Sequence, residues 1–407
     1  MAGDGAGHDG PLQGMRVIEL AHIMAGPVCG LMLADMGAEV IKVEKLEGDD
    51  TRRTVPPALE GESAAYMMMN RGKRGLSLDL KAPDGIAVLR RLLSGADALI
   101  ENYRGGTMER LGLGYETLRQ DFPHLVYCSL SGFGRSGPYA DRAGFDLVAQ
   151  GMSGLMSVTG EGPGRPPMKC GPPVTDITAG ILAAMGVLAA YTRRLKTGEG
   201  QVVDTSLFEA GITHTYWQSA IAMATGVAPG PMGSAHPLNA PYEAFATADG
   251  WITIGAANQK NWTKLLTALG MEHLAEDPRF ATNRDRMSHR EELAATLAPA
   301  FTTRGSSEWL ARLEAEGVPA GPVLDVAAMH ADPQTLAREM VVEVEHTRVG
   351  RMKTLGLPVK FSATPGRVHG AAPLLGEHSR AILAEAGYDA AAIDDLIARG
   401  IVRETLA

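Results

Sequence analysis

The sequence predicts an α/β protein with a large domain on an open, doubly wound parallel sheet and a smaller α+β domain. Two observations carry this prediction. Apolar, β-branched runs alternate with helical stretches from residue 15 to about residue 225, which is typical of such a sheet. From residue 226 the composition changes to GVAPGPMGSAHPLNAP, a Pro- and Gly-rich stretch that is typical of a linker.

The alternating elements support the parallel sheet one after another. MRVIEL (15–20) is a β-type run, the loop AHIM follows, and a helical stretch begins near Pro27. AEVIKVE is the next strand, and strand, helix and strand within about thirty residues form a βαβ unit. The pattern recurs, with strands at LSLDL, DALIENY, LVYCSL and VVDTSL and with helices over 83–93, from Asp176 to about Leu195, and over 207–225.

The remaining elements define the domain boundaries. YEAFATADGWITIGA predicts a β-hairpin with ATADG as its turn, and helices are expected around 260–269, 288–302 and 306–316. EMVVEVEH, TLGLPVKF and a final helical pair complete the chain. We therefore expect residues 1–225 in the large domain, 226–330 in the linker and small domain, and 331–407 returning to complete the large domain.

Composition and charge restrict the class of protein. With 45% hydrophobic and 21% charged residues, the 407-residue chain can bury a sizeable core. A net charge of −9 argues against a general nucleic-acid binder, which would carry a basic footprint. The three cysteines form no CxxC pair, so neither a zinc site nor a disulfide framework is expected. Without a signal-peptide pattern or an uncharged apolar run of about 18 residues, a cytoplasmic protein without membrane contact is expected.

The loop after the first strand is a candidate ligand site. Its sequence, AHIMAGPVCG, lacks the GxGxxG pattern, which argues against a nicotinamide dinucleotide. It still leads into a helix N-terminus, where backbone N–H groups favour a phosphate, and Pro27 suits a first helical turn. An ordinary βα loop would explain the same residues.

Basic residues gather in two segments, RGKRGLSLDLK and ENYRGGTMER, that flank strands of the same predicted sheet. They are Arg71, Lys73, Arg74, Lys81, Arg104 and Arg110. If the segments meet at one rim, they would suit an anion with several phosphates and a ring that stacks on Tyr103. A solvated charged rim is the alternative, and spacing alone favours it.

Asp176, in GPPVTDITAG, has no cation within several residues of the sequence. Thr175 or Asp176 would make a good helix N-cap, and this role alone would explain the carboxylate. A carboxylate here can instead attack an activated acyl group, because the helix dipole would keep it ionised while an apolar surround removes its water. His22 and His236 are the histidines best placed for ligand contact, and no metal-binding spacing is present.

Taken together, these segments resemble the family III CoA-transferases of the CaiB/BaiF type. The resemblance covers nearly the whole chain and is carried by AGPVCGLMLADMGAEVIKVE, NRGKRGLSLDLK, ENYRGGTMERLGLGY, SGFGRSGPY, GFDLVAQGMSGLMSVTG and GPPVTDITAG. It implies a large Rossmann-like domain built from both chain ends and a small domain between them. It also implies an obligate homodimer of two interlocked, ring-like subunits.

The resemblance assigns roles residue by residue. The catalytic aspartate falls on Asp176, and Asp146, in GFDLVAQ, takes the place of an active-site glutamate of formyl-CoA transferase. The implied CoA contacts are His22, Ile23, Ala25, Lys45, Leu78, Lys81, Asn102, Tyr103 and Arg110.

The resemblance also bears on the substrate. MGSAHPLNAP replaces the glycine-rich lid of formyl-CoA transferase, which argues against oxalate and formyl groups. GDDTRR, GSAHP and PYEAF are most similar to succinyl-CoA-dependent enzymes that handle dicarboxylates. A second substrate carboxylate would need a cation, for which the candidates are Arg52, Arg53, Arg142 and His236.

The implied reaction moves CoA reversibly from an acyl-CoA, such as succinyl-CoA, to a carboxylic acid through an aspartyl anhydride and an aspartyl-CoA thioester. CoA is then a substrate, and no prosthetic group is expected. The alternatives are an α-methylacyl-CoA racemase, a non-catalytic acyl-CoA-binding protein and, by fold alone, an NAD-linked oxidoreductase. The racemase would need a histidine where this chain has Phe145, which cannot move a proton.

Overall fold

In the computed structural model, residues 10–405 are described and form two compact units. Of the described residues, the first unit comprises 10–153, 170–214 and 333–405, and the second comprises 154–169 and 215–332. The division into 1–225, 226–330 and 331–407 stays a prediction. The compact units differ from it because residues 154–169 and 215–225 group with the second unit.

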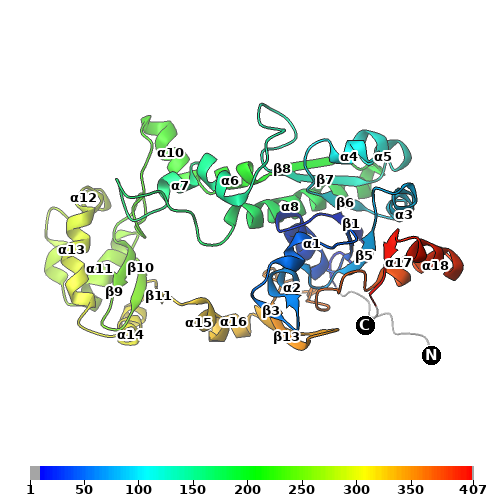
Figure 1. Cartoon of the computed structure of the whole chain (residues 1–407). Helices are drawn as coiled ribbons and strands as arrows, with labels where there is room; N and C mark the ends of the chain where they lie inside the picture. Colours follow the sequence, from blue (N-terminus) through cyan, green and yellow to red (C-terminus); the bar gives the residue numbers. More distant parts are fainter. Residues whose placement is uncertain (1–9, 406–407) are drawn as a thin grey trace. The chain divides into compact units, whose positions relative to one another are not determined.

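A seven-stranded sheet forms the centre of the first unit (Figure 1). Its order is β14-β5-β2-β1-β6-β7-β8, and all neighbours pair in parallel except β14, which is antiparallel to β5. The order from β5 to β8 is that of the doubly wound Rossmann sheet, so the predicted fold class is confirmed. The strands are β1 (Arg16–Leu20), β2 (Glu39–Glu44), β5 (Arg74–Leu78), β6 (Ala98–Glu101), β7 (Val126–Ser131), β8 (Val202–Ser206) and β14 (Val402–Arg403).

Helices cover both faces of this sheet. Successive strand residues point to opposite faces, and Val17 belongs to one apolar cluster while Ile18 belongs to another. The first cluster packs α1 (Ala25–Asp35) and α8 (Val174–Thr197) on the sheet. The second packs α3 (Pro83–Leu93), α5 (Tyr115–Asp121), α17 (Ser379–Glu385) and α18 (Ala390–Ala398) on the other face.

Helix α8 lies unusually close to α1. A Cβ added at Gly180 would stand 2.6 Å from the carbonyl oxygen of Ala25 and 2.7 Å from Cβ of Val28, so only glycine permits this packing. By length and composition alone, α8 is apolar enough to cross a bilayer. However, one face of α8, which includes Ala183 and Val187, is fully buried in the core of the first unit, as in a helix that packs on a sheet.

The second unit contains the predicted hairpin and its helices. Strands β9 (Tyr242–Ala246) and β10 (Trp251–Gly255) pair antiparallel, and β11 (Ala320–Pro322) joins β10. The helices that accompany them are α7 (Leu155–Val158), α10 (Tyr216–Thr225), α11 (Gln259–Leu269), α12 (Asn283–Ser288), α13 (Arg290–Phe301), α14 (Ser306–Glu316) and α15 (Val326–Ala331).

The single helix expected over 207–225 is wrong. The segment forms α9 (Leu207–Thr213) in the first unit and α10 in the second. The helix is interrupted because Thr215 leaves the helical conformation and becomes the N-cap of α10.

Several short elements of the first unit were not predicted from the sequence. They include a 3₁₀ turn, η1 (Asp50–Arg53), and α2 (Ala64–Asn70), which begins where the Ser63 hydroxyl accepts a hydrogen bond from the N–H of Tyr66. The others are β3 (Ala58–Leu59), β4 (Glu62–Ser63), α4 (Thr107–Arg110), α6 (Asp146–Met152), α16 (Pro333–Ala337) and the hairpin of β12 (Val341–His346) with β13 (Gly350–Leu355).

Candidate active site

A cavity of about 410 Å³ opens in the first unit at the carboxyl ends of β1, β6, β7 and β8. Doubly wound sheets bind ligands at this edge, where the strand order reverses on the two sides of the first strand. The order here reverses between β1 and β6, and the loops that follow both strands line the cavity. Its walls are residues 22–25, 102–105, 130–132, 140 and 142–145, together with Asp50, Asp176 and Leu207.

Asp176 reaches this cavity because of the position of α8. It lies in the first turn of the helix, four residues before Gly180, and residues four apart share one helix face. The contact of Gly180 with Ala25 therefore turns Asp176 toward the loop that follows β1. Among residues 10–405, the half-buried Asp176 carboxylate has no hydrogen-bond or ion-pair partner.

The expectation that Thr175 or Asp176 caps α8 is wrong. The helix begins at Val174, and its N-terminus is capped from another element by Asp146. One oxygen of Asp146 accepts hydrogen bonds from the backbone N–H of Thr175 (3.0 Å) and from its hydroxyl (2.7 Å), while the other accepts one from Nε2 of Gln150 (2.8 Å). Asp146 thus satisfies a free N–H of the first turn, and Asp176 is left without a capping role.

Burial dominates the charge state of Asp176. The pKa of this carboxyl is raised to about 7, first because burial removes water from the charged form and second because the Asp146 carboxylate is nearby. The helix dipole was expected to keep Asp176 ionised, but these two effects outweigh it. At neutral pH the protonated and ionised forms are both populated.

Five of the nine predicted CoA contacts line the same cavity as Asp176: His22, Ile23, Ala25, Asn102 and Tyr103. The Asn102 side chain accepts a hydrogen bond from the N–H of His22 (2.9 Å) and donates one to its carbonyl (2.8 Å), so it joins the loops that follow β1 and β6. The rings of His22 and Tyr103 lie 5.6 Å apart, and burial raises the pKa of Tyr103 to about 12.

Lys45 lies at a second, smaller cavity of about 110 Å³. This cavity shares His22, Asp50 and Tyr103 with the larger one, so the two are adjacent. The Lys45 ammonium forms a 2.9 Å ion pair with Asp50. Lys45 and the rings of His22 and Tyr103 are therefore available beside the main cavity to contact a ligand.

Three predicted contacts lie elsewhere. Leu78 is buried in the core beneath α3 and α18, whereas Lys81 and Arg110 are exposed, and none of the three lines either cavity. The Arg110 guanidinium donates a hydrogen bond to the hydroxyl of Thr107.

The predicted basic rim is wrong in part. Arg71, Lys73 and Arg74 precede or begin β5, whereas Arg104 follows β6. Because the sheet is parallel, these segments lie at opposite edges. Arg71 and Lys73 are moreover buried and paired with Asp35 and Glu19.

The candidate substrate cations are also dispersed. Arg142 lines the cavity and its guanidinium lies 3.9 Å from the ring centre of Tyr139. Arg52 is instead committed to an ion pair with Glu44 (2.7 Å), and Arg53 pairs with Asp50. His236 belongs to the second unit, where its ring stacks on that of Tyr242.

Sequence reasoning missed the residues that hold the cavity walls. Arg135, in the segment SGFGRSGPY, donates hydrogen bonds to the Glu101 carboxylate (2.6 Å) and to the carbonyl of Tyr103 (3.1 Å). This joins the loop after β7 to the loop after β6. The glycines Gly132 and Gly144 could have indicated a second place where two backbone segments approach closely. A Cβ on Gly132 would stand 2.7 Å from Cα of Gly144. Within residues 10–405, no cluster of His, Cys, Asp or Glu is arranged to hold a metal ion.

Comparison with known proteins defines the family. The sequence model of CoA-transferase family III matches residues 12–379. The chain is 43% identical to a succinate–glutarate CoA-transferase of Agrobacterium fabrum over 92% of its length and 95% of that protein. It is 36% identical to the human succinyl-CoA:glutarate CoA-transferase, covering 96% of this chain and 90% of that one.

A solved structure agrees with these relatives. The crystal structure of a CaiB/BaiF family protein from Brucella suis superimposes with a TM-score of 0.83 at 42% identity, covering 93% of this chain and all of the other. An open α/β sheet with its cavity at the strand ends is typical of proteins that bind ligands at that edge. The chain belongs to CoA-transferase family III, and it is a CoA-transferase.

Replacement of Asp176 by Asn tests the cost of its burial. With a pKa of about 7 against an ordinary 3.8, the folded state binds the proton more tightly than the unfolded state, so stability falls as the pH rises between these values. The Asp176→Asn variant has no carboxyl at this position to ionise, so it does not lose this stability as the pH rises. Its free energy of unfolding should exceed that of wild type by roughly 1–3 kcal/mol at pH 8, and the difference should shrink toward pH 4. Urea denaturation at both pH values measures it, and an equal difference at both would contradict the argument.

Proposed function

We propose that the enzyme transfers CoA between succinyl-CoA and a dicarboxylic acid such as glutarate, with Asp176 as the nucleophile. The observation that carries this proposal is the unpaired Asp176 carboxylate on a cavity that also holds five of the expected CoA contacts. The substrate pair follows the names of the relatives from Agrobacterium fabrum and human. Arg142, on the same cavity, is the proposed partner for the second carboxylate of the acid.

The first half of the reaction removes the donor acid. An Asp176 oxygen attacks the thioester carbonyl, the carbon–sulfur bond breaks, and a mixed anhydride and CoA thiolate form. The thiolate then attacks the aspartyl carbonyl, releasing the donor carboxylate and leaving an aspartyl-CoA thioester.

The second half repeats these steps in reverse order. The acceptor carboxylate attacks the aspartyl thioester, which gives a new anhydride and thiolate. The thiolate attacks the acyl carbonyl of the acceptor, and Asp176 is released as a carboxylate. No net proton is transferred, so the cycle needs an ionised Asp176 but no general base.

The surroundings of Asp176 suit this chemistry. A carboxylate that is poorly solvated and free of a cation is a stronger nucleophile than one held in an ion pair. We propose that Asp146 contributes in two ways, since it caps the N-terminus of α8 and repels charge on Asp176. CoA is proposed to contact His22, Ile23, Ala25, Asn102, Tyr103 and Lys45, with Leu78, Lys81 and Arg110 retained from the family resemblance alone.

The racemase alternative is less well supported. It requires a histidine at the position of Phe145, whose side chain lines the cavity and is 67% exposed. A phenyl ring there cannot exchange a proton with the α-carbon of a substrate. Phe145 instead offers an apolar wall to the acyl chain.

We further propose a cytoplasmic homodimer that uses no prosthetic group. Apolar side chains are exposed on α8 and α10, including Met185 (61%) and Trp217 (58%). On α8, Ile181 (48% exposed) lies four residues before Met185, so the two share one exposed apolar face that an interface would cover. Light scattering of the purified protein should give twice the mass of one chain at all concentrations, and a stable, active monomer would contradict the dimer.

Asp176→Asn should abolish transfer from succinyl-CoA to glutarate, by at least about 10³-fold in kcat, because the amide cannot form the anhydride. Incubation of wild type with succinyl-CoA and hydroxylamine should place a hydroxamate on Asp176, detectable by peptide mass spectrometry. Asp121→Asn, an exposed site paired with Arg90, is the control and should keep full activity. Transfer by the Asp176→Asn protein, or turnover without a trapped aspartyl group, would refute the nucleophile.

Asp146→Asn should change the pH dependence of transfer. The like charge of Asp146 helps to raise the pKa of Asp176 to about 7, so its removal should move the inflection of kcat/KM to lower pH. Thr175→Val removes a hydroxyl that Asp146 binds but keeps the charge, and its inflection should stay in place. Identical inflections for wild type and Asp146→Asn would show that Asp146 has no electrostatic role.

A further inference from the structure

Ile23 adopts an unusual backbone conformation at the wall of the cavity. Its φ angle is +66°, in the left-handed region. β-Branched residues rarely adopt this region, because their side chains crowd the backbone. Such a residue remains there only where its surroundings hold it, and such residues cluster at functional sites. The side chain of Ile23 is 39% exposed and lines the cavity, so apolar burial of the side chain does not supply the restraint.

The backbone N–H of Ile23 is held by the carboxylate of Asp49. Nitrogen-to-oxygen distances are 3.2 Å to one oxygen and 3.3 Å to the other, so both oxygens share the donor. Asp49 is buried and lies 26 residues away, in the turn after β2. The preceding residue, His22, is fixed by Asn102 through both its N–H and its carbonyl. The loop after β1 is therefore held from two sides.

The Asp49 carboxylate has little freedom to move. One oxygen accepts the N–H (2.9 Å) and the hydroxyl (2.8 Å) of Thr51, and the other forms a 3.0 Å ion pair with the fully buried Lys42. Lys42 is itself held by Glu19 and by the carbonyl of Ala21. Although burial opposes them, these partners hold the pKa of Asp49 well below its usual range.

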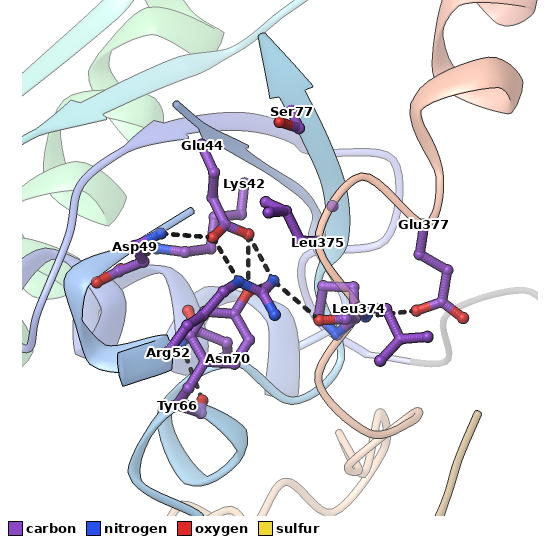
Figure 2. A network of polar contacts seen from close by, with 12 residues as sticks. Lys42, Glu44, Asp49, Arg52, Tyr66, Asn70, Ser77, Leu374, Leu375 and Glu377 are labelled. Atoms are coloured by element: carbon purple, nitrogen blue, oxygen red, sulfur yellow. Dashed lines mark hydrogen bonds and ion pairs between the residues drawn. The ribbon is translucent and has the colours of Figure 1, made fainter. Parts of the chain in front are cut away.

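A second layer of contacts fixes the turn that carries Asp49. Figure 2 shows Glu44 accepting a hydrogen bond from the Asp49 N–H and two from the Arg52 guanidinium. The Tyr66 hydroxyl also donates to Glu44, and Arg52 lies over the Tyr66 ring and donates to the carbonyl of Pro373. The network thus anchors the turn to α2 and to the chain's C-terminal segment. Arg52, expected from the sequence to bind substrate, serves here to hold this turn.

We propose that Asp49 is a positioning residue for CoA-thioester binding. It holds the Ile23 peptide in the conformation that shapes the cavity wall between the loops after β1 and β6. This inference rests on the proposed function, because it assumes that the cavity receives the thioester.

The geometry predicts an effect on binding rather than on the acyl-transfer steps. Asp49 does not line the main cavity, although it lines the smaller cavity beside Lys45, and the proposed nucleophile Asp176 lies on a different element, α8. When the restraint is lost, Ile23 relaxes to an ordinary conformation. Only a fraction of the molecules then has the loop in the conformation that binds CoA. The apparent Kd rises in inverse proportion to that fraction.

Asp49→Asn is the first test, read by calorimetric titration with CoA and by steady-state kinetics with succinyl-CoA and glutarate. The amide has one acceptor oxygen, so its NH₂ group faces either the Thr51 donors or Lys42. We expect the Kd for CoA to rise about tenfold to a hundredfold, which corresponds to ~1.4–2.8 kcal/mol. At saturating thioester, kcat should change less than about threefold. Asp84→Asn, an exposed site paired with Arg399, is the matched control and should leave both constants unchanged.

Combination with Ile23→Gly separates positioning from a general structural role. Glycine adopts positive φ without strain, so Asp49→Asn should weaken CoA binding by less than about threefold when it is added to Ile23→Gly. An equal loss with and without the Ile23→Gly change, or no loss in either case, would overturn the inference while leaving the proposed function intact. If wild type binds no CoA, the proposed function fails and this inference fails with it.

A second pair of variants does not depend on the folding of the Asp49→Asn protein. Ile23→Pro fixes φ near −65° and removes the N–H that Asp49 binds, at an exposed position. We expect it to lose CoA affinity by about the same factor as Asp49→Asn, while Ile23→Gly retains more affinity. Equal CoA affinity of the Ile23→Pro and Ile23→Gly proteins would overturn the inference.

Discussion

The close approach of α8 to α1 at Gly180 determines where the carboxylate of Asp176, the proposed nucleophile, lies. A Cβ at this position would stand only 2.6 Å from the Ala25 carbonyl oxygen, so no side chain fits and the two helices meet backbone to backbone. Asp176 shares the face of Gly180 and is thereby turned to the loop after β1. The chain places a single glycine where two helices must touch, and the carboxylate one turn earlier gains access to the cavity.

Several buried cations of the first unit are used for structure. Lys42 and Lys73 share Glu19 in the interior, and Arg52 binds Glu44. Buried charges require such partners, since an unpaired one is costly to desolvate. Within the described residues 10–405, Asp176 has none, and its pKa is raised to about 7 instead. The same physical cost that compels pairing elsewhere raises the pKa of this carboxyl.

The walls of the cavity depend on contacts between loops. Asn102 joins His22 to the loop after β6, Arg135 joins the loop after β7 to Tyr103, and Asp49 holds Ile23. Each of these residues acts on the backbone of another segment. Parallel strands that end at one edge bring these loops together, but the polar contacts decide the shape of the space between them.

The sequence by itself determined the doubly wound sheet and the hairpin of the second unit, because periodicity is a property of neighbouring residues. For Asp176 it left a helix cap and a nucleophile as alternatives. It misjudged the cap of α8, the break at Thr215 and the basic rim. Only the tertiary structure placed Asp146 on Thr175, Arg71 at the opposite edge from Arg104, and Asp49 on Ile23. These contacts and positions involve residues that are far apart in the sequence. They are set only when the strands align and the helices pack.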